Sequence, residues 1–295
     1  FMHKSGFVNI IGNPNVGKST LMNALVGEKL SIITSKAQTT RHRILGIVNG
    51  DDFQIVFSDT PGILKPCYKL QESMMNFVRG ALSDADVLLY VTDTVERDDE
   101  RAAEIIDRIR QSGVPTLVVV NKIDLTTQEA LEALVEKWRA TLPDAEIIPI
   151  SAREGFNIAG LFDRILALLP EGEPFYPKDT LTDKTLRFFA SEIIREKILR
   201  NYDKEIPYSC EIEIEEYREE PGIDRISAVI YVARNSQKGI LIGHKGEKLK
   251  KVGRQAREEL EEFLRKKVFL QLFVKVSEDW RNDQRQLRRF GYDPQ

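Results

Sequence analysis

The sequence predicts an α/β domain with a mostly parallel sheet flanked by helices, followed by a smaller α+β domain. Up to about residue 170, short apolar segments alternate with segments of helical periodicity, a pattern typical of a parallel sheet. A proline-rich break then precedes a different order of elements. We therefore expect a first domain over 1–170, a linker over 171–183, and a second domain with a C-terminal tail over 184–295.

The strands expected in the first domain are short runs rich in Val, Ile and Leu. The run Leu117–Val120 is entirely apolar, as expected of a strand buried on both faces. In such a sheet, ligands bind beyond the carboxyl ends of the strands. The expected strands are Phe7–Ile11, Ile44–Val48, Phe53–Phe57, Val87–Thr92, Thr116–Val120 and Glu146–Ile150.

The break is the segment Pro170–Pro177, in which three prolines and a glycine cannot extend a helix or fill a central strand. In the strand expected next, Cys210, Ile212 and Ile214 alternate with glutamates, which predicts one buried and one solvated face. The second domain is expected to contain a helix (184–202), two strands (208–217 and 225–233), a short helix, a helix (247–265) and a strand (268–276).

The composition is that of a soluble globular protein with two cores: 295 residues, 42% hydrophobic and 30% charged. Cys67 and Cys210 are far apart, without metal-ligand spacing, which argues against a disulfide framework or a zinc site. No apolar run approaches the roughly 20 residues that span a bilayer, and no secretion signal is evident. A reducing, cytoplasmic setting is expected.

The net charge of −3 is unevenly distributed. The segment 234–257 contains eight Lys and Arg residues and one acid, Glu247. A solvated helix face is the ordinary explanation of such a run. A nucleic-acid surface is the alternative.

The octet Gly12–Ser19 fits the pattern G-x-x-x-x-G-K-[ST], in which backbone N–H groups surround phosphate oxygens and a lysine adds a positive charge. An ordinary loop is the alternative. However, the octet lies between an expected strand and an expected helix, where phosphates would meet a helix N-terminus. The expected binding residues are Gly12, Asn13, Pro14, Asn15, Val16, Gly17, Lys18, Ser19 and Thr20.

A second motif, Asp59-Thr60-Pro61-Gly62, follows the third expected strand. We expect Lys18 to contact the β and γ phosphates, Ser19 to bind Mg²⁺, and Asp59 to reach the metal through water. Gly62 allows a backbone N–H to approach the γ phosphate. Taken alone, the motif is a common turn, but its place after a strand favours a phosphate sensor built from Asp59, Thr60, Pro61 and Gly62.

The motif Asn121-Lys122-Ile123-Asp124 predicts which base is bound. The Asp124 carboxylate can accept two hydrogen bonds from guanine, whereas adenine offers no matching pair of donors, so GTP is expected over ATP. Asn121 is expected to brace the loops and the Lys122 stem to cover the base. At Ser151 and Ala152, the Ala152 N–H is expected to meet the guanine carbonyl. A polar strand end is the alternative.

The polar segment Lys36–Arg43 is the expected first switch. We expect the Thr40 hydroxyl, with Thr39 as the alternative, to complete the Mg²⁺ shell when the γ phosphate is bound. Arg41 and Arg43 are more simply explained as solvated loop arginines than as catalytic groups. Ser19, Thr40 and Asp59 are thus the expected metal residues, and Lys18, Thr40 and Gly62 the expected catalytic residues.

Ile63 follows Gly62 where Ras-like GTPases carry the glutamine that orients the attacking water. Hydrolysis by this chain alone should therefore be slow. Asn15 is a candidate ligand for a K⁺ ion by analogy with related GTPases, and a loop-bracing amide is an equal alternative.

The segment Gly243-His244-Lys245-Gly246 places G-x-x-G between two expected helices inside the basic cluster. Such a loop clamps about four nucleotides of single-stranded RNA in KH domains, and the element order matches the type II form. Two helix-ending glycines are the alternative. The expected RNA-binding residues are Gly243, His244, Lys245, Gly246, Lys248, Lys250, Lys251 and Arg254.

The switch Gln38–Arg43, the motif Asp59–Gly62 and the loop Gly243–Gly246 together resemble the Era family of bacterial GTPases, over essentially the whole chain. The resemblance implies a P-loop GTPase domain followed by a type II KH domain, with GTP, GDP and Mg²⁺ as cofactors. It implies binding of small-subunit ribosomal RNA near its 3′ end, assistance to 30S assembly, stimulation of hydrolysis by RNA, and peripheral contact with the inner membrane. No stable oligomer is expected.

Two other functions remain open from the residues alone. One is a scaffold that nucleotide stabilises without turnover and whose second domain binds protein. The other is a GTPase serving tRNA modification or membrane transport. In the switch hypothesis, GTP changes how the two domains dock and thereby opens or closes the RNA groove.

Overall fold

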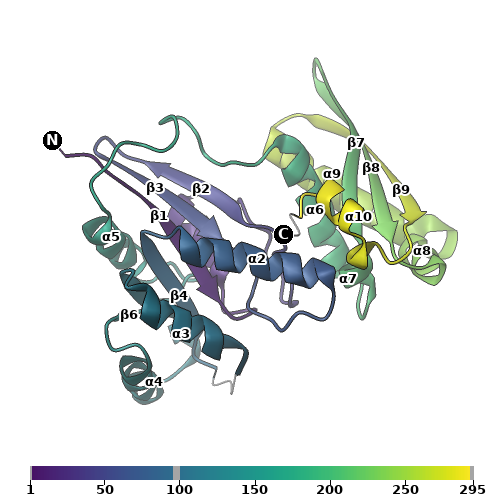
Figure 1. Cartoon of the computed structure of the whole chain (residues 1–295). Coiled ribbons are helices and arrows are strands. Elements are labelled where there is room, and N and C mark those ends of the chain that lie inside the picture. Colours follow the sequence, from purple (N-terminus) through teal and green to yellow (C-terminus); the bar gives the residue numbers. More distant parts are fainter. Residues whose placement is uncertain (1, 96–99, 293–295) are drawn as a thin grey trace. The chain divides into compact units, whose positions relative to one another are not determined.

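The computed structural model describes residues 2–95 and 100–292, which form two compact units (Figure 1). The first unit contains residues 1–66 and 74–183, and the second contains residues 67–73 and 184–295. The segment 171–183, expected as a linker, is thus counted with the first unit. The short segment 67–73 is counted with the second.

A six-stranded sheet forms the centre of the first unit, in the order β2-β3-β1-β4-β5-β6. All neighbouring strands are parallel except β2, which is antiparallel to β3, so the expected mostly parallel sheet is confirmed. The strands are β1 (Lys4–Gly12), β2 (Ile44–Asn49), β3 (Phe53–Asp59), β4 (Val87–Asp93), β5 (Thr116–Asn121) and β6 (Glu146–Pro149).

Helices cover both faces of this sheet. α1 and α5 pack against each other on one face, and α2 and α3 lie over the other (Figure 1). Residues of the continuous apolar strands, such as Val8, Ile10 and Val118, are completely buried. The helices are α1 (Lys18–Val26), α2 (Lys69–Ser83), α3 (Ala103–Ser112), α4 (Gln128–Thr141) and α5 (Ile158–Leu168).

The segment 170–183 is hydrogen-bonded to the sheet of the first unit. Single bridges join Glu171 to Lys4 and Thr182 to Gly46. The buried Gln54 side chain donates to the Tyr176 carbonyl (2.8 Å) and accepts from the Phe175 N–H (2.8 Å). These bonds hold a proline-rich segment that cannot form regular structure of its own.

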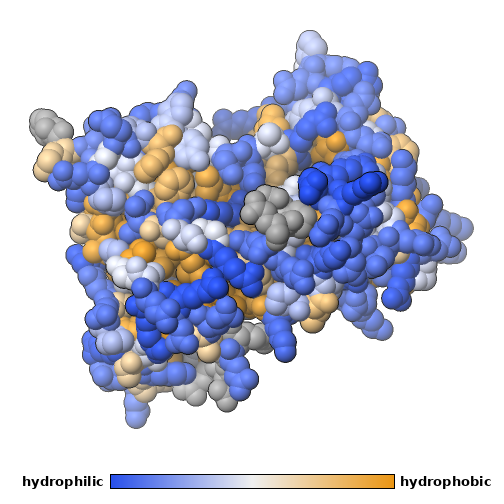
Figure 2. Space-filling model, viewed as in Figure 1, coloured by the Kyte–Doolittle hydropathy of each residue, from blue (hydrophilic) through white to orange (hydrophobic). Residues whose placement is uncertain are grey.

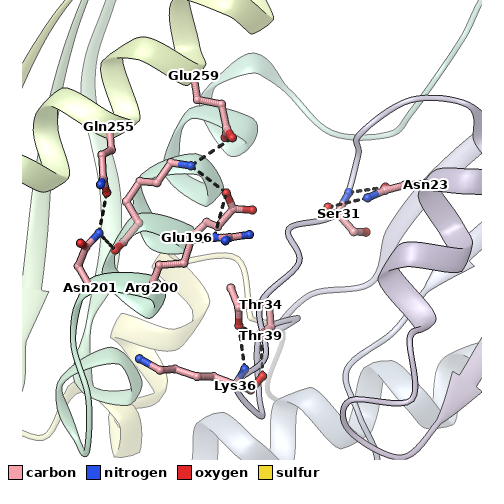
Figure 3. Close-up of polar contacts among 11 residues, drawn as sticks. Asn23, Ser31, Thr34, Lys36, Thr39, Glu196, Arg200, Asn201, Gln255 and Glu259 are labelled. Carbon is pink, nitrogen blue, oxygen red and sulfur yellow. Dashed lines mark hydrogen bonds and ion pairs between the residues drawn. The ribbon is translucent and has the colours of Figure 1, made fainter. Parts of the chain in front are cut away.

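The second unit is built on a three-stranded sheet, β7-β8-β9, in which β8 is antiparallel to β7 and parallel to β9. Asn201 on α6 donates to Gln255 on α9 (2.7 Å) and joins the two long helices (Figure 3). The elements are α6 (Leu186–Asn201), α7 (Ile206–Ser209), β7 (Glu211–Glu220), β8 (Ile223–Val232), α8 (Asn235–Ile242), α9 (Glu247–Leu264), β9 (Lys267–Val276) and α10 (Gln284–Arg289).

Two expectations for β7 are corrected. The strand begins at Glu211 rather than at residue 208, because Pro207 lies in the first turn of α7, where proline is well tolerated. Cys210, Ile212 and Ile214 are buried as expected, but Glu211 is buried too (6% exposed) and accepts from the Tyr292 hydroxyl (2.6 Å). The C-terminal segment therefore covers part of the face that was expected to be solvated.

The surface of the second unit is mostly hydrophilic on the face drawn in Figure 2. Within residues 2–95 and 100–292, no helix combines the length and the apolar composition needed to cross a bilayer. Cys67 is exposed and Cys210 is buried, and neither forms a disulfide bond within the described residues.

Candidate nucleotide and RNA sites

The phosphate loop joins the end of β1 to the start of α1, and close packing dictates its two glycines. A Cβ on Gly12 would lie 2.3 Å from the Val91 carbonyl oxygen, and one on Gly17 would lie 2.2 Å from Asn121 Nδ2. Gly17 also has a φ of 97°, a left-handed conformation that glycine adopts readily. The loop therefore fits closely against the ends of β4 and β5.

The loop after β3 is fastened to the phosphate loop. The Ile63 N–H donates to the Gly12 carbonyl (3.0 Å), and a Cβ on Gly62 would lie 2.9 Å from Pro14 Cα. Lys18 is 7% exposed, and its Nζ donates to the Asn13 carbonyl (2.8 Å). The ammonium group is thus held over the loop, where it can add charge to the backbone N–H groups.

Three oxygen-bearing side chains meet beside Lys18. Ser19 Oγ donates to Asp59 Oδ2 (2.7 Å) and lies 3.0 Å from Thr40 Oγ1. Asp59 is completely buried, and its Oδ1 makes no hydrogen bond within the part of the chain that the structure describes. Burial raises the pKa of Asp59, while Lys18 and the Ser19 hydroxyl act in the opposite direction.

This donor set fits Mg²⁺. Two hydroxyls and a carboxylate are the oxygen ligands that this cation prefers, and the free capacity of Asp59 Oδ1 suits a water ligand of the metal. Thr40, rather than Thr39, lies at the cluster. Thr39 Oγ1 donates to the Lys36 carbonyl (2.7 Å) and is 2.6 Å from Thr34 Oγ1, so it belongs to a turn within the switch segment (Figure 3).

A cavity of about 310 Å³ opens beside the cluster. Two groups of side chains line it, one expected from the motifs and one not. The expected residues are Pro14, Asn15, Gly17, Lys18, Ser19, Thr20, Lys36, Gln38, Thr39, Thr40, Thr60, Gly62 and Lys122; the others are Ile32, Ile33, Thr34 and Ser35.

The side chain of Asn121 braces three segments around the expected base site. Its Nδ2 donates to the Val16 carbonyl (2.9 Å), and its Oδ1 accepts from the Ala152 N–H (3.0 Å). The Ser151 hydroxyl donates to Asp124 Oδ1 (2.8 Å), which fixes one oxygen of that carboxylate. Among the residues that the structure describes, none donates a hydrogen bond to Asp124 Oδ2.

Lys122 crosses from the base site to the phosphate loop. It adopts a left-handed conformation (φ 64°), and its Nζ donates to the Asn15 carbonyl (2.5 Å) and pairs with Asp93 (3.0 Å). The lysine stem is therefore held along one side of the site.

The loop of the second unit lies between α8 and α9. Gly243 and Gly246 have φ values of 75° and 74°, and His244 and Lys245 between them are exposed. A Cβ on Gly243 would lie 2.8 Å from the Lys248 Cβ, so glycine allows the loop to approach α9 closely. The two inner side chains are consequently presented to solvent.

Basic side chains continue from this loop along the first turns of α9. Lys248 Nζ lies 5.2 Å from the centre of the Tyr202 ring, and the Tyr202 hydroxyl donates to the Leu241 carbonyl. Ile240 is 50% exposed on the preceding helix. An apolar residue, a glycine loop and several exposed cations therefore share one end of the unit. The exposed basic residues are Lys245, Lys248, Lys250, Lys251 and Arg254.

Comparison with known proteins agrees with both sites. A family model described as a 50S ribosome-binding GTPase matches residues 7–122, and a KH domain model matches residues 205–281. The chain is 46% identical to the GTPase Era of Syntrophus aciditrophicus (strain SB), covering 99% of this chain and 96% of that protein. The chain belongs to the Era family of GTPases.

Further Era proteins give the same result. The GTPase Era of Staphylococcus haemolyticus (strain JCSC1435) is 45% identical, over 98% of this chain and 97% of that protein. A solved Era structure in complex with MgGDPNP and nucleotides 1506–1542 of 16S ribosomal RNA is 43% identical, with a TM-score of 0.94, over 98% of this chain and 99% of that one. An Aquifex aeolicus Era variant bound to GDP·AlF4⁻ gives a TM-score of 0.93 at 43% identity, with the same coverage. The chain is thus a GTPase with a P-loop domain and a KH domain.

Several site residues expected for this Era-family chain lie outside the cavity. Thr60, by contrast, lies in the cavity lining. Its hydroxyl donates to the Ile10 carbonyl (2.7 Å) and so anchors the loop to β1. The Ala152 N–H, expected at the guanine carbonyl, donates to Asn121 in this structure, so that contact stays a prediction that requires the N–H to be shared. The expected residues away from the cavity lining are Gly12, Asn13, Val16, Asp59, Pro61, Asn121, Asp124, Ser151 and Ala152.

The interpretation of Arg41 and Arg43 as solvated arginines is wrong. Arg41 is 2% exposed. Arg43 forms two hydrogen bonds with the Asp84 carboxylate (2.7 and 2.9 Å) and donates to Ser58 Oγ (3.0 Å), so it fastens the end of the switch segment to the sheet. Only the fold brings these partners together, because Asp84 lies in the turn before β4.

The start of the switch segment, before Lys36, was not predicted from the sequence. Ile32, Ile33, Thr34 and Ser35 line the cavity, although their mixed polarity carries no motif. Their place directly before the polar segment Lys36–Arg43 was the available signal.

Proposed function

We propose that this Era-family chain is a GTP-hydrolysing switch that binds small-subunit ribosomal RNA near its 3′ end and assists assembly of the 30S subunit. The observation that carries the proposal is the presence, in one chain, of the Ser19–Asp59–Thr40 oxygen cluster and the exposed loop Gly243–Gly246. The Era structure bound to a 16S ribosomal RNA fragment, 43% identical over 98% of this chain, supports the same pairing of activities.

At the nucleotide site, each group has a distinct task. Lys18 and the backbone N–H groups of the phosphate loop bind the phosphates, and Ser19 and Thr40 would hold Mg²⁺ directly. When bound, Mg²⁺ neutralises charge on the β and γ phosphates. Gly62, which packs against Pro14, brings the backbone of the next loop to the γ phosphate. The loss of that phosphate would release Thr40 and Gly62 together.

Hydrolysis requires a group beyond those in the cavity. Ile63 is 2% exposed, and its side chain has no polar atom with which to orient water. The attacking water must therefore be positioned by backbone groups, by an ion or by the bound RNA. A K⁺ ion near Asn15, an exposed residue of the cavity lining, stays a prediction that exchange of Na⁺ for K⁺ tests.

At the RNA site, the loop Gly243–Gly246 supplies backbone contacts to phosphates and the lysines of α9 supply charge. Ile240, half exposed beside the loop, offers an apolar surface on which an unstacked base can pack. The acidic second half of α9, which includes Glu258 and Glu262, limits the positive surface to the end that bears the loop.

The RNA site is tested with the double variant His244→Asp/Lys245→Asp. RNA affinity for the 3′ end of small-subunit ribosomal RNA should fall at least about tenfold, because the clamp loses the positive charge of Lys245 and gains two carboxylates that repel phosphates. Basal GTP hydrolysis should be unchanged. The control is Lys137→Asp/Arg139→Asp, which changes the net charge similarly at two exposed residues of α4. RNA affinity equal to that of the control would favour a protein-binding scaffold.

Two finer expectations are also proposed from the family resemblance. The first is binding to the whole 30S subunit, which sedimentation of the chain with 30S particles checks. The second is peripheral contact with a membrane, which flotation with phospholipid vesicles checks. Neither depends on the other.

A further inference from the structure

One buried hydroxyl next to the metal-binding oxygens belongs to none of the sequence motifs. Ser31 follows α1 and directly precedes the switch residues that line the cavity. It is 1% exposed, and its Oγ makes no hydrogen bond of normal geometry within residues 2–95 and 100–292. A buried hydroxyl without a partner is uncommon in native proteins and calls for an explanation.

The position of Ser31 is fixed by Asn23, one helical turn after Ser19 on α1. Asn23 Nδ2 donates to the Ser31 carbonyl (2.9 Å), and Asn23 Oδ1 accepts from the N–H groups of Leu30 (2.9 Å) and Ser31 (3.0 Å). Figure 3 shows this pairing of Asn23 with Ser31. The helix that carries Ser19 therefore also sets the place of Ser31.

The Ser31 hydroxyl interacts with the Asp59 carboxylate. Asp59 Oδ2 is already occupied by Ser19 Oγ, whereas Asp59 Oδ1 is buried and without a partner. Ser31 Oγ and Asp59 Oδ1 are thus buried polar atoms of two interacting side chains, and neither makes a hydrogen bond of normal geometry among the described residues.

We propose that Ser31 is a positioning residue of the Mg²⁺ site, whose hydroxyl holds a water ligand of the metal together with Asp59 Oδ1. Mg²⁺ retains several of its waters in proteins, so its site needs polar groups at the distance of those waters as well as direct ligands. Ser31 and Asp59 Oδ1 are such groups. This inference rests on the proposed function, since it concerns the metal that accompanies the nucleotide.

The test is the release of a fluorescent GDP analogue from Ser31→Ala, measured over a range of Mg²⁺ concentrations and in excess EDTA. Bound Mg²⁺ is expected to slow the release of GDP. The Mg²⁺ concentration at which half of this slowing is reached should be about tenfold higher for Ser31→Ala than for the unsubstituted chain, which is the size of effect typical of groups that act through a metal's ligands. Release in EDTA should be unchanged, because the phosphate and base contacts remain.

The matched control is Ser5→Ala. Ser5 is also a buried serine of the first unit (2% exposed) with an unpartnered Oγ, but it lies near the start of β1, away from the motif-bearing strand ends. Its substitution should leave the Mg²⁺ dependence unchanged. A second variant, Asn23→Ala, should give the same shift as Ser31→Ala, and the double variant should add nothing further, because both act on one hydroxyl.

Equal Mg²⁺ dependence in Ser31→Ala and Ser5→Ala would overturn the inference and make Ser31 a packing residue. That result leaves the proposed function intact, provided that the unsubstituted chain retains GDP more strongly in Mg²⁺. An unsubstituted chain whose release of GDP ignores Mg²⁺ would overturn both. The two failures are therefore distinguishable in one experiment.

Discussion

We propose that the single side chain of Asp124 determines which base is bound. Ser151 holds Asp124 Oδ1, which fixes the plane of the carboxylate before a nucleotide arrives. A base that offers no donors would leave a carboxylate oxygen desolvated and unpaired, a cost of about 1–3 kcal/mol. Guanine selectivity therefore arises as much from rejection of adenine as from attraction of guanine.

Replacement of that carboxylate gives the first prediction. Asp124→Asn should lower GTP affinity at least about tenfold and raise affinity for xanthosine triphosphate, because the amide now offers a donor to the extra carbonyl of xanthine. Competition with a fluorescent GDP analogue measures both affinities. Asp144→Asn, an exposed residue that follows α4, is the control and should change neither. Unaltered base preference in Asp124→Asn would mean that the base is read elsewhere.

Tyr202 gives a prediction at alkaline pH. Burial raises the pKa of its hydroxyl to about 12, above the ordinary value of 10.0, with a smaller contribution from Cys210. Because the folded state favours the neutral hydroxyl, this stabilisation is complete below pH 10 and is lost as the pH rises from about 10 through about 12. Tyr202→Phe should flatten that loss in urea unfolding followed from pH 8 to pH 12. An equally steep loss in the variant would contradict the assignment.

The residues of the candidate nucleotide site lie at the ends of strands and helices rather than in their middles. β1 ends at Gly12, β3 at Asp59 and β5 at Asn121, so three parallel strands deliver a phosphate loop, a metal residue and a base-site residue to one edge of the sheet. The switch segment between α1 and β2 closes that edge. Its two ends are tied down, by Asn23 at Ser31 and by Asp84 at Arg43, while the residues between them form the cavity lining.

The hydrogen bonds of Arg43 at the end of the switch segment give a prediction about stability. The Arg43 side chain is 17% exposed and bonds to Asp84 and Ser58, whereas the Arg139 side chain is 64% exposed and pairs only with Glu136 in the bonds that the structure records. Arg43→Ala should lower the free energy of unfolding by about 1–2 kcal/mol, and Arg139→Ala by less than about 0.5 kcal/mol. Urea unfolding compares them. Equal effects would show that Arg43 is not a structural tie.

Most elements of the first unit could be predicted because their signals are local. A continuous apolar run such as Leu117–Val120 specifies a strand buried on both faces, and each motif fixes a turn after a strand. The role of Arg43 could not be predicted, since its partner Asp84 is 41 residues away in sequence. Glu211 looked solvated for the same reason, because Tyr292 covers it from 81 residues away.

Within the site, the sequence indicated which motif residues lie together, and their binding of nucleotide and metal stays a prediction, whereas groups placed by packing gave no signal. Ser19, Asp59 and Thr40 were expected together and are in contact. Ser31 belongs to no sequence motif. Its place depends on one hydrogen bond that Asn23 donates to the Ser31 carbonyl and two that Asn23 accepts from the Leu30 and Ser31 N–H groups, and the sequence around Ser31 does not indicate them.

At the scale of the whole molecule, the chain itself links the two activities. The phosphate-sensing motif ends at Gly62, and the segment 67–73 that follows it is counted by its contacts with the second unit. Within that unit, the Arg281 guanidinium lies 4.4 Å from the centre of the Tyr68 ring, and the Lys69 N–H donates to Asn282 (3.2 Å). We therefore expect a change at Gly62 to affect residues 67–73 of the second unit through the few residues of chain between them.

This connection predicts that RNA affinity depends on the nucleotide. Affinity for the 3′ end of small-subunit ribosomal RNA should differ between the forms bound to a GTP analogue with Mg²⁺, to GDP, and to no nucleotide. A coupling free energy of about 1–3 kcal/mol, typical of such linkage, corresponds to about 5–150-fold. Fluorescence anisotropy with a labelled RNA measures it. Identical affinity in all three states would exclude the coupling.

The rate of GTP hydrolysis with and without that RNA tests the central claim most directly. We predict slow hydrolysis by the chain alone, because Ile63 offers no polar group to the attacking water, and faster hydrolysis when RNA is added. ATP should be hydrolysed far more slowly than GTP, and His244→Asp/Lys245→Asp should keep the basal rate but lose the stimulation. Equal hydrolysis of ATP and GTP, or a rate that RNA leaves unchanged, would contradict the account.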